Sequence, residues 1–480
     1  MMMIKRLTIL QINDLHGCVE PHPELVRSAQ GDQFQTLGGL ARIAAPVKQI
    51  RTGMQDGVLL LDNGDTFHRT YLAVQSNGEA LAPLMNAFKP DAMTVHWEFA
   101  YGPDQVQRLA NMLSYPILAI NCFRVDGELF FQPYLIRERS GLRVAVIAIA
   151  CHIVDKTMPR AFSEGLRFSV GREELPEWIR HVREHERADL VVILSHLGFP
   201  QDVKLASEVD GIDILVSGHT HNRMEAPVME NGAIIFQSGC HGSFIGRLNL
   251  DIDDGEIVRH HHQLIAVDER FAPDREVQQQ VDTAMAPYRT ILSQIVGHTN
   301  VALTRYQSLQ CSMDDLLLDA IALAAGTEIA FSNGWRYGAP IPPGPIIIND
   351  LWNIIPTNPA VETVELTGEE IRVMLEENLE RTFSSDPFQQ MGGYVKRCRG
   401  VRLYVKIENP VGSRVDRLFV LGAPVDPDRR YTAAFVTDQG VPMKFGCNRT
   451  VLDTRAIEAL QRYLALSTAG SCSNGSVTAV

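Results

Sequence analysis

The first half of the chain alternates short apolar runs with amphipathic segments, and this alternation constrains the fold more than any other feature. The length of the runs and their content of valine, isoleucine and leucine are typical of strands buried on both faces. Such strands are expected over residues 7–12, 57–62, 91–95, 116–121, 144–150, 190–195, 213–218 and 233–239. Helices are expected between some of them, over residues 103–113 and 173–186. Strand–helix alternation of this kind predicts an α/β domain.

The pattern changes after residue 299, which indicates a second domain of α+β type. A length of 480 residues also favours two domains over one core. Helices are expected over residues 312–326 and 368–383, and strands over 400–407, 415–422 and 430–437. We place the first domain at residues 1–268, a connecting helix interrupted at Pro287 at 269–298, the second domain at 299–466 and a flexible tail at 467–480.

Composition and charge exclude several classes of protein. The formal net charge of −13 argues against binding of a nucleic-acid polymer, although one basic pocket remains compatible with it. No apolar run approaches the ~20 residues of a membrane span, and the N-terminal run is too short for a signal peptide, so we expect a cytoplasmic protein. The eight cysteines form no CxxC pair, which favours reduced, buried thiols over disulfides. Nothing in the sequence predicts an oligomeric state.

Carboxylates and imidazoles follow the expected strands of the first domain. They are Asp14 and His16 in LQINDLHG, Asp65 in LLLDNGDTF, His196 in VVILSHLGF, and His219 and His221 in DILVSGHTHN. Each motif alone is weak, because a histidine after a strand is more often structural. In combination they converge where α/β sheets assemble their sites. Residues at i and i+2 of an extended segment also point the same way.

These ligand types suit divalent Mn, Fe, Co, Ni or Zn. Two such ions roughly 3.5–4 Å apart can clamp a phosphoryl group and activate a water molecule. The sequence therefore predicts a metal centre in the first domain.

The order of the motifs D-x-H, GD, an HEF-like segment, SHLG and GHTH resembles the metallophosphoesterase (calcineurin-like) superfamily. It is most similar to the 5′-nucleotidase branch, which includes UDP-sugar hydrolases and 2′,3′-cyclic-nucleotide phosphodiesterases. The resemblance covers nearly the whole chain. It implies a four-layer α/β/β/α catalytic domain, a connecting helix and a C-terminal α+β domain of 5′-nucleotidase type that binds the substrate.

The resemblance also implies two divalent ions, with manganese favoured, and it assigns their ligands. One ion would be held by Asp14, His16, Asp65 and His221, and the other by Asp65, His96, His196 and His219. Asp65 would bridge the two ions, because a carboxylate can bind both at once.

The segment VHWEFAYG departs from the family's usual GNHEFDYG. The family's metal-binding Asn falls on His96, its catalytic His on Trp97, and the Asp that orients this His on Ala100. An indole neither titrates near neutral pH nor accepts a proton, so we assign no catalytic acid. Loss of general acid help, typically ~10²–10⁴-fold, is tolerable where the leaving group is good. A second alignment places His96 on the catalytic His.

The same segment, together with NGWRYG and GGYVKR, also resembles the bacterial thiosulfohydrolases. Those enzymes use two manganese ions to remove a sulfate group from the cysteine of a carrier protein, in the periplasm. The resemblance therefore leaves a sulfur-linked ester open as the substrate.

The segment 329–346 resembles the family's substrate-binding motif, with Asn333 and Arg336 on the matching Asn and Arg. In the family these residues reach into the interdomain cleft and hold the phosphate or the base; a solvated loop arginine is the alternative. The family also stacks the base between two aromatic rings. Candidates here are Tyr394, Phe445, Trp335 and Tyr337, and a packing role is equally open for each.

Three hypotheses follow. The first is a dinuclear metal-dependent hydrolase of small phosphate esters, with nucleotides favoured, that works by attack of a metal-bound hydroxide. The second is the same metal chemistry on a sulfur-linked ester. The third is a non-catalytic metal- or nucleotide-binding protein, which six intact ligands disfavour.

Overall fold

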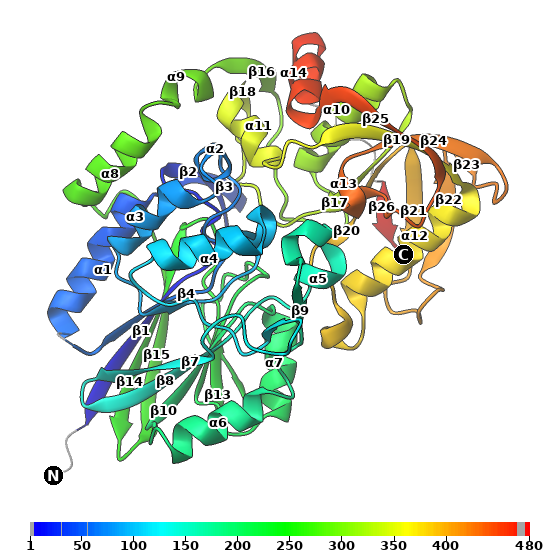
Figure 1. Cartoon of the computed structure of the whole chain (residues 1–480). Coiled ribbons are helices and arrows are strands. Elements are labelled where there is room, and N and C mark those ends of the chain that lie inside the picture. The colour runs from blue at the N-terminus through cyan, green and yellow to red at the C-terminus, as the bar shows by residue number, and fades with distance from the viewer. Residues whose placement is uncertain (1–3, 30, 55, 468–475) are drawn as a thin grey trace. The chain divides into compact units, whose positions relative to one another are not determined.

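The computed structural model describes residues 4–29, 31–54, 56–467 and 476–480. The chain divides into two compact units, one up to Pro287 and one from Tyr288 (Figure 1). Among the described residues, no helix combines the length and the apolar character needed to cross a membrane. The seven described cysteines are free thiols, six of them buried, as the sequence predicts; Cys472 lies outside the described residues.

The first unit contains a five-stranded sheet in the order β15-β14-β1-β4-β5. Strand β1 (Lys5–Ile12) runs parallel to β4 (Val58–Asp62), which runs parallel to the short β5 (Ala92–Met93). Two antiparallel strands, β14 (Phe244–Asp253) and β15 (Glu256–Ala266), complete the sheet. The carboxyl ends of β1, β4 and β5 therefore meet at one edge.

A six-stranded sheet lies beside it in the order β12-β13-β11-β10-β8-β7. Its four central strands are parallel and its two outer strands antiparallel. The strands are β7 (Tyr134–Arg139), β8 (Leu142–Ile149), β10 (Leu190–Ser195), β11 (Ile214–Ser217), β12 (Val228–Glu230) and β13 (Ala233–Phe236).

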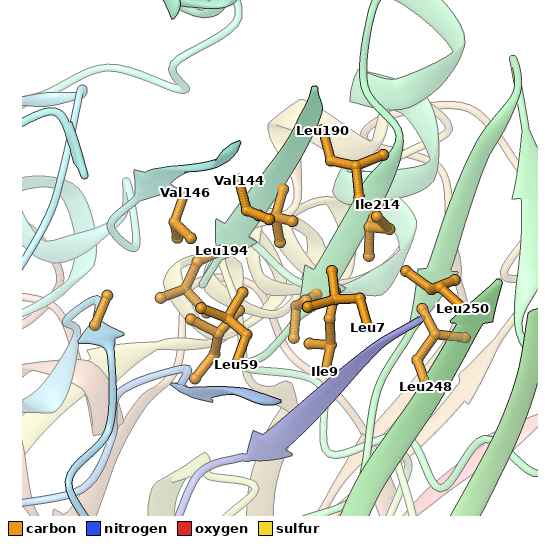
Figure 2. Close-up of a cluster of buried hydrophobic side chains, with 14 of the residues drawn as sticks. Leu7, Ile9, Leu59, Val144, Val146, Leu190, Leu194, Ile214, Leu248 and Leu250 are labelled. Carbon is orange, nitrogen blue, oxygen red and sulfur yellow. The ribbon is translucent and has the colours of Figure 1, made fainter. Parts of the chain in front are cut away.

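The core of the unit lies between the two sheets. Figure 2 shows Leu7 and Ile9 of β1 facing Leu194 of β10 and Ile214 of β11 across the layer. Leu10, on the opposite face of β1, is buried as well, so the strand is covered on both sides as predicted.

Helices cover the outer faces of the sheets. The long helices α1 (Leu40–Met54), α6 (Leu175–Glu184) and α7 (Phe199–Glu208) contact β4, β8 and β11 respectively. The unit is therefore the predicted four-layer α/β/β/α domain (Figure 1). Shorter elements join the layers: α2 (Tyr71–Gln75), α3 (Ala82–Asn86), α4 (Pro103–Met112), β6 (Cys122–Arg124), α5 (Val154–Thr157) and β9 (Leu166–Phe168).

Two local predictions for this unit were incomplete. Residues 116–121 form only isolated bridges, from Ile117 to Met93 and from Leu118 to Gln132, instead of a strand. A hairpin of β2 (Pro21–Ser28) and β3 (Gly31–Gly38) was not predicted, because its many exposed polar residues lack the apolar pattern of a buried strand.

The second unit has the predicted α+β character. Its five-stranded sheet has the order β20-β17-β24-β19-β25, and a four-stranded sheet has the order β23-β22-β21-β26. The strands of the larger sheet are β17 (Ile329–Gly334), β19 (Ala360–Thr367), β20 (Tyr394–Arg399), β24 (Arg430–Phe435) and β25 (Cys447–Arg455). The smaller sheet contains β21 (Val401–Val405), β22 (Val415–Val420) and β23 (Ala423–Pro424).

The helices of this unit are α10 (Ser312–Ala325), α11 (Ile348–Ile354), α12 (Gly368–Phe383), α13 (Thr437–Gly440) and α14 (Ala456–Leu466). Helix α12 begins where the sequence predicts. Thr367 accepts a hydrogen bond from the backbone of Glu370, and the Glu370 carboxylate accepts one from the backbone of Thr367.

The predicted connecting helix is interrupted at Pro287, as the sequence indicates, but it ends earlier than predicted. The structure has α8 (Arg275–Met285), capped by Asp274, and a separate short α9 (Arg289–Leu292); Pro287 lies between them and has no backbone N–H to continue the helical hydrogen bonds. Residues expected at the end of the connecting helix instead form β16 (Ile295–Thr299), which pairs with β18 (Gly344–Ile347).

The predicted flexible tail is ordered at its end. Residues 468–475 lie outside the described residues, but β26 (Val477–Ala479) pairs with β21.

Candidate metal centre

All seven predicted ligands lie just beyond the carboxyl ends of parallel strands in the first unit. Asp14 and His16 follow β1, Asp65 follows β4, His96 follows β5, His196 follows β10, and His219 and His221 follow β11. Two sheets thus contribute to one site, in the place where α/β sheets bind ligands.

The backbone around the site is strained. Asp14, His16, Asp65, His219 and His221 have positive φ angles between 46° and 70°. Residues other than glycine adopt this region only at a cost in free energy, and such outliers concentrate at functional sites. The expectation that an extended backbone directs the pairs Asp14/His16 and His219/His221 was therefore wrong in detail, because left-handed turns direct these side chains.

One cluster consists of Asp65, His96, His196 and His219, whose ligand atoms lie within 4.8 Å of one another. His96 Nδ1 is 3.2 Å from Asp65 Oδ2, and His196 Nε2 is 3.4 Å from the same oxygen. All four residues are buried. This is the residue set that the sequence assigns to one of the two ions.

A second cluster consists of Asp14, His16 and His221. His221 Nε2 lies 3.3 Å from Asp14 Oδ1 and 3.3 Å from His16 Nε2. His16 Nε2 is also 3.6 Å from Asp65 Oδ2. Asp65 therefore stands between the two clusters, where the sequence places a bridging carboxylate.

The donor set fits divalent cations. Asp14 Oδ1 is buried and accepts no hydrogen bond from any residue that the structure describes. His196 Nδ1 lies 2.6 Å from the carbonyl oxygen of Asn63, which favours a proton on Nδ1 and directs the Nε2 lone pair at the carboxylates.

The electrostatic field around His96 and His196 favours a cation, whereas burial lowers the pKa of His16 well below its usual range. Burial would lower the pKa of His196, but the carboxylates of Asp65 and Asp14 raise it to about 10. Burial likewise opposes the charge on His96, yet Asp65 holds its pKa well above the usual range. Carboxylates that attract a proton this strongly onto an imidazole also attract a metal ion into the same space.

The segment HWEF forms hydrogen bonds with residues of the candidate metal centre through its backbone and through the Glu98 carboxylate. The Glu98 carboxylate accepts hydrogen bonds from the backbone N–H groups of Asp65 (3.3 Å), Thr66 (2.7 Å) and His96 (2.8 Å). The backbone N–H of Trp97 donates to Asp65 Oδ1 at 2.7 Å. The sequence aligns Glu98 with the family motif but does not reveal this bracing.

The sequence comparison aligns the family's acid dyad with Trp97 and Ala100, whose side chains do not titrate near neutral pH. The indole ring of Trp97 stacks on the imidazole of His68, with centroids 4.7 Å apart and an interplanar angle of 22°. Trp97 is buried, and Ala100 follows it in the short 3₁₀ helix Trp97–Tyr101. His68 and Arg69 are both buried but were not among the predicted site residues. Their position directly after the GDTF motif is the sequence feature that could have indicated them.

A polar network joins the two sheets beneath the ligands. Asn63 Nδ2 donates to the carbonyl oxygens of Ser195 (2.9 Å) and Val216 (2.8 Å). Ser195 directly precedes His196, and Val216 lies three residues before His219. The buried carboxylate of Asp202 accepts hydrogen bonds from the hydroxyl groups of Ser195 and Ser217. Such supporting contacts fix the orientation of ligands.

The two predicted substrate-binding residues lie in the second unit, at the end of β17 and just after it. Arg336 Nη2 donates to the carbonyl oxygen of Gly393 at 3.1 Å, and its guanidinium carbon lies 5.3 Å from the ring centre of Tyr394. Asn333 stands at a bulge between β17 and β20. The structure brings both residues to the segment 392–394, and their role in binding stays a prediction.

Three of the four candidate aromatic residues are buried. Trp335 and Tyr337 are 4% and 2% exposed and stack on each other, and Phe445 belongs to the core of the second unit. These environments favour packing roles. Tyr394 is partly exposed, beside Arg336.

Comparison with protein families gives two matches that together cover most of the chain. Residues 7–223 match the family model of calcineurin-like phosphoesterases. Residues 295–437 match the model of the 5′-nucleotidase C-terminal domain.

Similar proteins extend this result. A snake venom 5′-nucleotidase of Naja atra is 25% identical over 466 residues, which cover 86% of this chain and 84% of that protein. The trifunctional nucleotide phosphoesterase YfkN of Bacillus subtilis is also 25% identical, but this chain spans only 30% of its length.

Solved structures give the same fold. The sulfate thiohydrolase SoxB of Thermus thermophilus is similar with a TM-score of 0.90 and 26% identity, covering 99% of this chain and 96% of that one. A 5′-nucleotidase precursor from Thermus thermophilus shares the fold, with a TM-score of 0.87 and 22% identity over 99% of both chains.

The fold and the buried Asp/His clusters define a metal-dependent hydrolase of phosphoric esters. The chain belongs to the calcineurin-like phosphoesterases that carry a 5′-nucleotidase C-terminal domain.

Proposed function

We propose that this protein is a dinuclear metal-dependent hydrolase of small phosphate esters, with nucleotides as the favoured substrates. The observation that carries the proposal is the position of Asp65 Oδ2, within 3.6 Å of His16 and within 3.4 Å of both His96 and His196. One carboxylate oxygen thus faces imidazoles from both clusters, as a ligand shared by two ions must.

Each ion has its own ligands in this proposal. Asp14, His16, Asp65 and His221 would hold one, and Asp65, His96, His196 and His219 the other. Two divalent ions held by these residues would supply charge for the transferring phosphoryl group and would activate a water molecule. Manganese is the favoured metal, since carboxylates with imidazoles suit it, and a screen of metals tests this choice.

The protein's own groups do the remaining work. Glu98 and the Trp97 backbone fix Asp65, so that the ligands need little reorganisation when a substrate binds. Neither Trp97 nor Ala100 can protonate a leaving oxygen. The proposal therefore favours esters whose leaving group departs without a proton, such as diphosphates and cyclic esters.

Asn333 and Arg336 are the proposed substrate-binding residues of the second unit. Arginine binds phosphate through a planar pair of N–H donors. We expect Arg336→Ala to raise KM for a phosphate ester more than it lowers kcat, and Arg336→Lys to recover only part of the loss.

Hydrolysis of a sulfur-linked ester is the second candidate. It rests on the shared HWEF segment and on the similarity to the sulfate thiohydrolase, at a TM-score of 0.90. A thiolate leaving group needs no acid, which suits the tryptophan at position 97.

One experiment separates these candidates. The purified protein, loaded with Mn²⁺, is assayed on nucleoside monophosphates, 2′,3′-cyclic nucleotides, UDP-sugars, aryl phosphates and a protein thiosulfonate. Turnover of nucleotides supports the first candidate, and turnover of only the thiosulfonate supports the second. Absence of bound metal together with absence of turnover on every substrate refutes both. A cytoplasmic location stays a prediction, which fractionation of cells tests.

A further inference from the structure

A third group of metal-ligand side chains lies beside the proposed dinuclear centre. It consists of His221, Cys240 and His241, whose candidate ligand atoms lie within 4.8 Å of one another. Cys240 and His241 follow β13, the next parallel strand after β11, so they stand at the same sheet edge as His221. The proposed function uses neither of them.

His241 points to a missing ligand. Its side chain is completely buried, and neither ring nitrogen forms a hydrogen bond with any residue that the structure describes. The carboxylate nearest to its Nδ1 is Glu24 Oε2, at 3.9 Å. A buried imidazole without a hydrogen bond is costly, and a metal ion would satisfy one of its nitrogens.

The segment that carries the two residues is firmly placed. The backbone N–H of His241 donates to the carbonyl oxygen of Asp14 at 2.8 Å, and its own carbonyl oxygen lies 3.0 Å from His22 Nε2. The Glu24 carboxylate is held by Ser243 Oγ (2.8 Å) and Arg223 Nη2 (2.8 Å). The backbone that carries Cys240 and His241 is therefore held by contacts with distant segments of the chain.

Charges of both signs surround Cys240. Two carboxylates, Glu24 and Asp14, and two guanidiniums, Arg223 and Arg69, act on the thiol from the surrounding elements. Burial raises the pKa of Cys240 well above its usual range, so the thiol is neutral without a metal. A coordinated thiol loses its proton outright, and the thiolate then offsets part of the charge of the ion.

We propose that Cys240 and His241 bind a further, thiophilic divalent ion of the zinc class, with His221 as a ligand that this ion shares with the Asp14/His16 ion of the proposed function. A thiolate with two imidazoles is a typical zinc donor set and leaves a fourth position open. This ion differs from the two in the proposed function, whose predicted ligands are carboxylates and imidazoles only. The proposal stands or fails independently of the substrate.

Cobalt substitution of the full-length protein tests the proposal. Metal-free protein is titrated with Co²⁺, and the near-ultraviolet thiolate-to-cobalt charge-transfer absorption is recorded, because oxygen and nitrogen ligands do not produce this band. We expect the band in the wild-type protein, its loss in Cys240→Ser, and a shifted, weaker band in His241→Gln. Zinc displaces the cobalt and removes the band.

Two variants serve as matched controls. Cys398→Ser removes a buried thiol of the second unit, and Cys151→Ser removes a buried thiol beside His96. Both are expected to keep the band. A wild-type protein without the band, a band that survives Cys240→Ser, or a band lost in Cys151→Ser would overturn the proposal. If Cys240→Ser does not fold, an unchanged band in folded His241→Gln overturns it equally.

Discussion

The backbone N–H of Trp97 donates a hydrogen bond to Asp65 Oδ1 at 2.7 Å, while Asp65 Oδ2 faces the imidazole of His96 at 3.2 Å. The residue that replaces the family's catalytic histidine thus still positions the carboxylate proposed to bridge the metals. An indole carries no acid function near neutral pH, but the backbone N–H of Trp97 still binds Asp65. The metal centre and the acid dyad are therefore separable, and each can be tested alone.

Restoring the acid dyad should restore general acid catalysis. We expect the double variant Trp97→His with Ala100→Asp to raise kcat for an alkyl phosphate by at least ~10-fold, and for an aryl phosphate by much less. The reason is that a poor leaving group needs the proton more. The dependence of log kcat on the pKa of the leaving group measures this effect. Ala100→Asp alone is the control. If the slope of log kcat against the pKa of the leaving group is unchanged in the double variant, the hypothesis that Trp97 replaces a catalytic acid is refuted.

Metal content should report which ligands are shared. Asp65 faces both clusters, so Asp65→Asn is expected to reduce bound manganese by about two ions per chain, whereas His96→Ala reduces it by about one. Metal analysis after equilibrium dialysis gives both numbers. The exposed His185→Ala is the control. An unchanged manganese content in His96→Ala would contradict the alignment that makes His96 a ligand.

The sequence was most informative where chemistry is local. Helix α12 spans residues 368–383, as predicted, and the signal for its first residue is local because the capping box lies within four residues. The seven predicted ligands lie together because each follows the carboxyl end of a parallel strand in one of the two sheets. Contacts between distant segments were not predictable: Arg305 and Arg397 both bind the buried Asp314, and no periodicity in the sequence reveals that pairing.

The turns around the metal centre were also beyond a sequence pattern. The sequence motifs identify Asp14 and His16 as a pair, but the left-handed backbone that directs them follows from tertiary contacts. The backbone N–H of His16, for example, donates to the carbonyl oxygen of Asp65. His241 shows the same limit, because burial without a partner is visible only in three dimensions.

Replacing Glu98 should loosen the metal centre without touching a ligand. Glu98→Gln keeps the size of the side chain. It places an NH₂ group against backbone N–H groups that donate to the Glu98 carboxylate in the wild-type protein. We expect a loss of about 3 kcal/mol in the free energy of unfolding and weaker manganese binding. Urea unfolding and metal titration measure the two effects. The exposed Glu128→Gln should change neither, and a Glu98→Gln protein of wild-type stability would exclude the bracing role.

The buried Lys396 should make the stability of the second unit depend on pH at alkaline values. Its ammonium group donates to the carbonyl oxygens of Gln439 (2.7 Å) and Gly440 (2.8 Å), and burial lowers its pKa to about 8. In the unfolded chain the group titrates near ~10.4, so between these values the unfolded state binds more protons than the folded state. The lysine therefore makes the free energy of unfolding rise with pH across this window, by up to about 3 kcal/mol, and contributes no pH dependence below pH ~8.

Urea unfolding of the wild-type protein and of Lys396→Met at several pH values isolates this contribution as the difference between the two curves. The exposed Lys444→Met is the control, and parallel curves for the wild-type protein and Lys396→Met would show that Lys396 keeps its ordinary pKa.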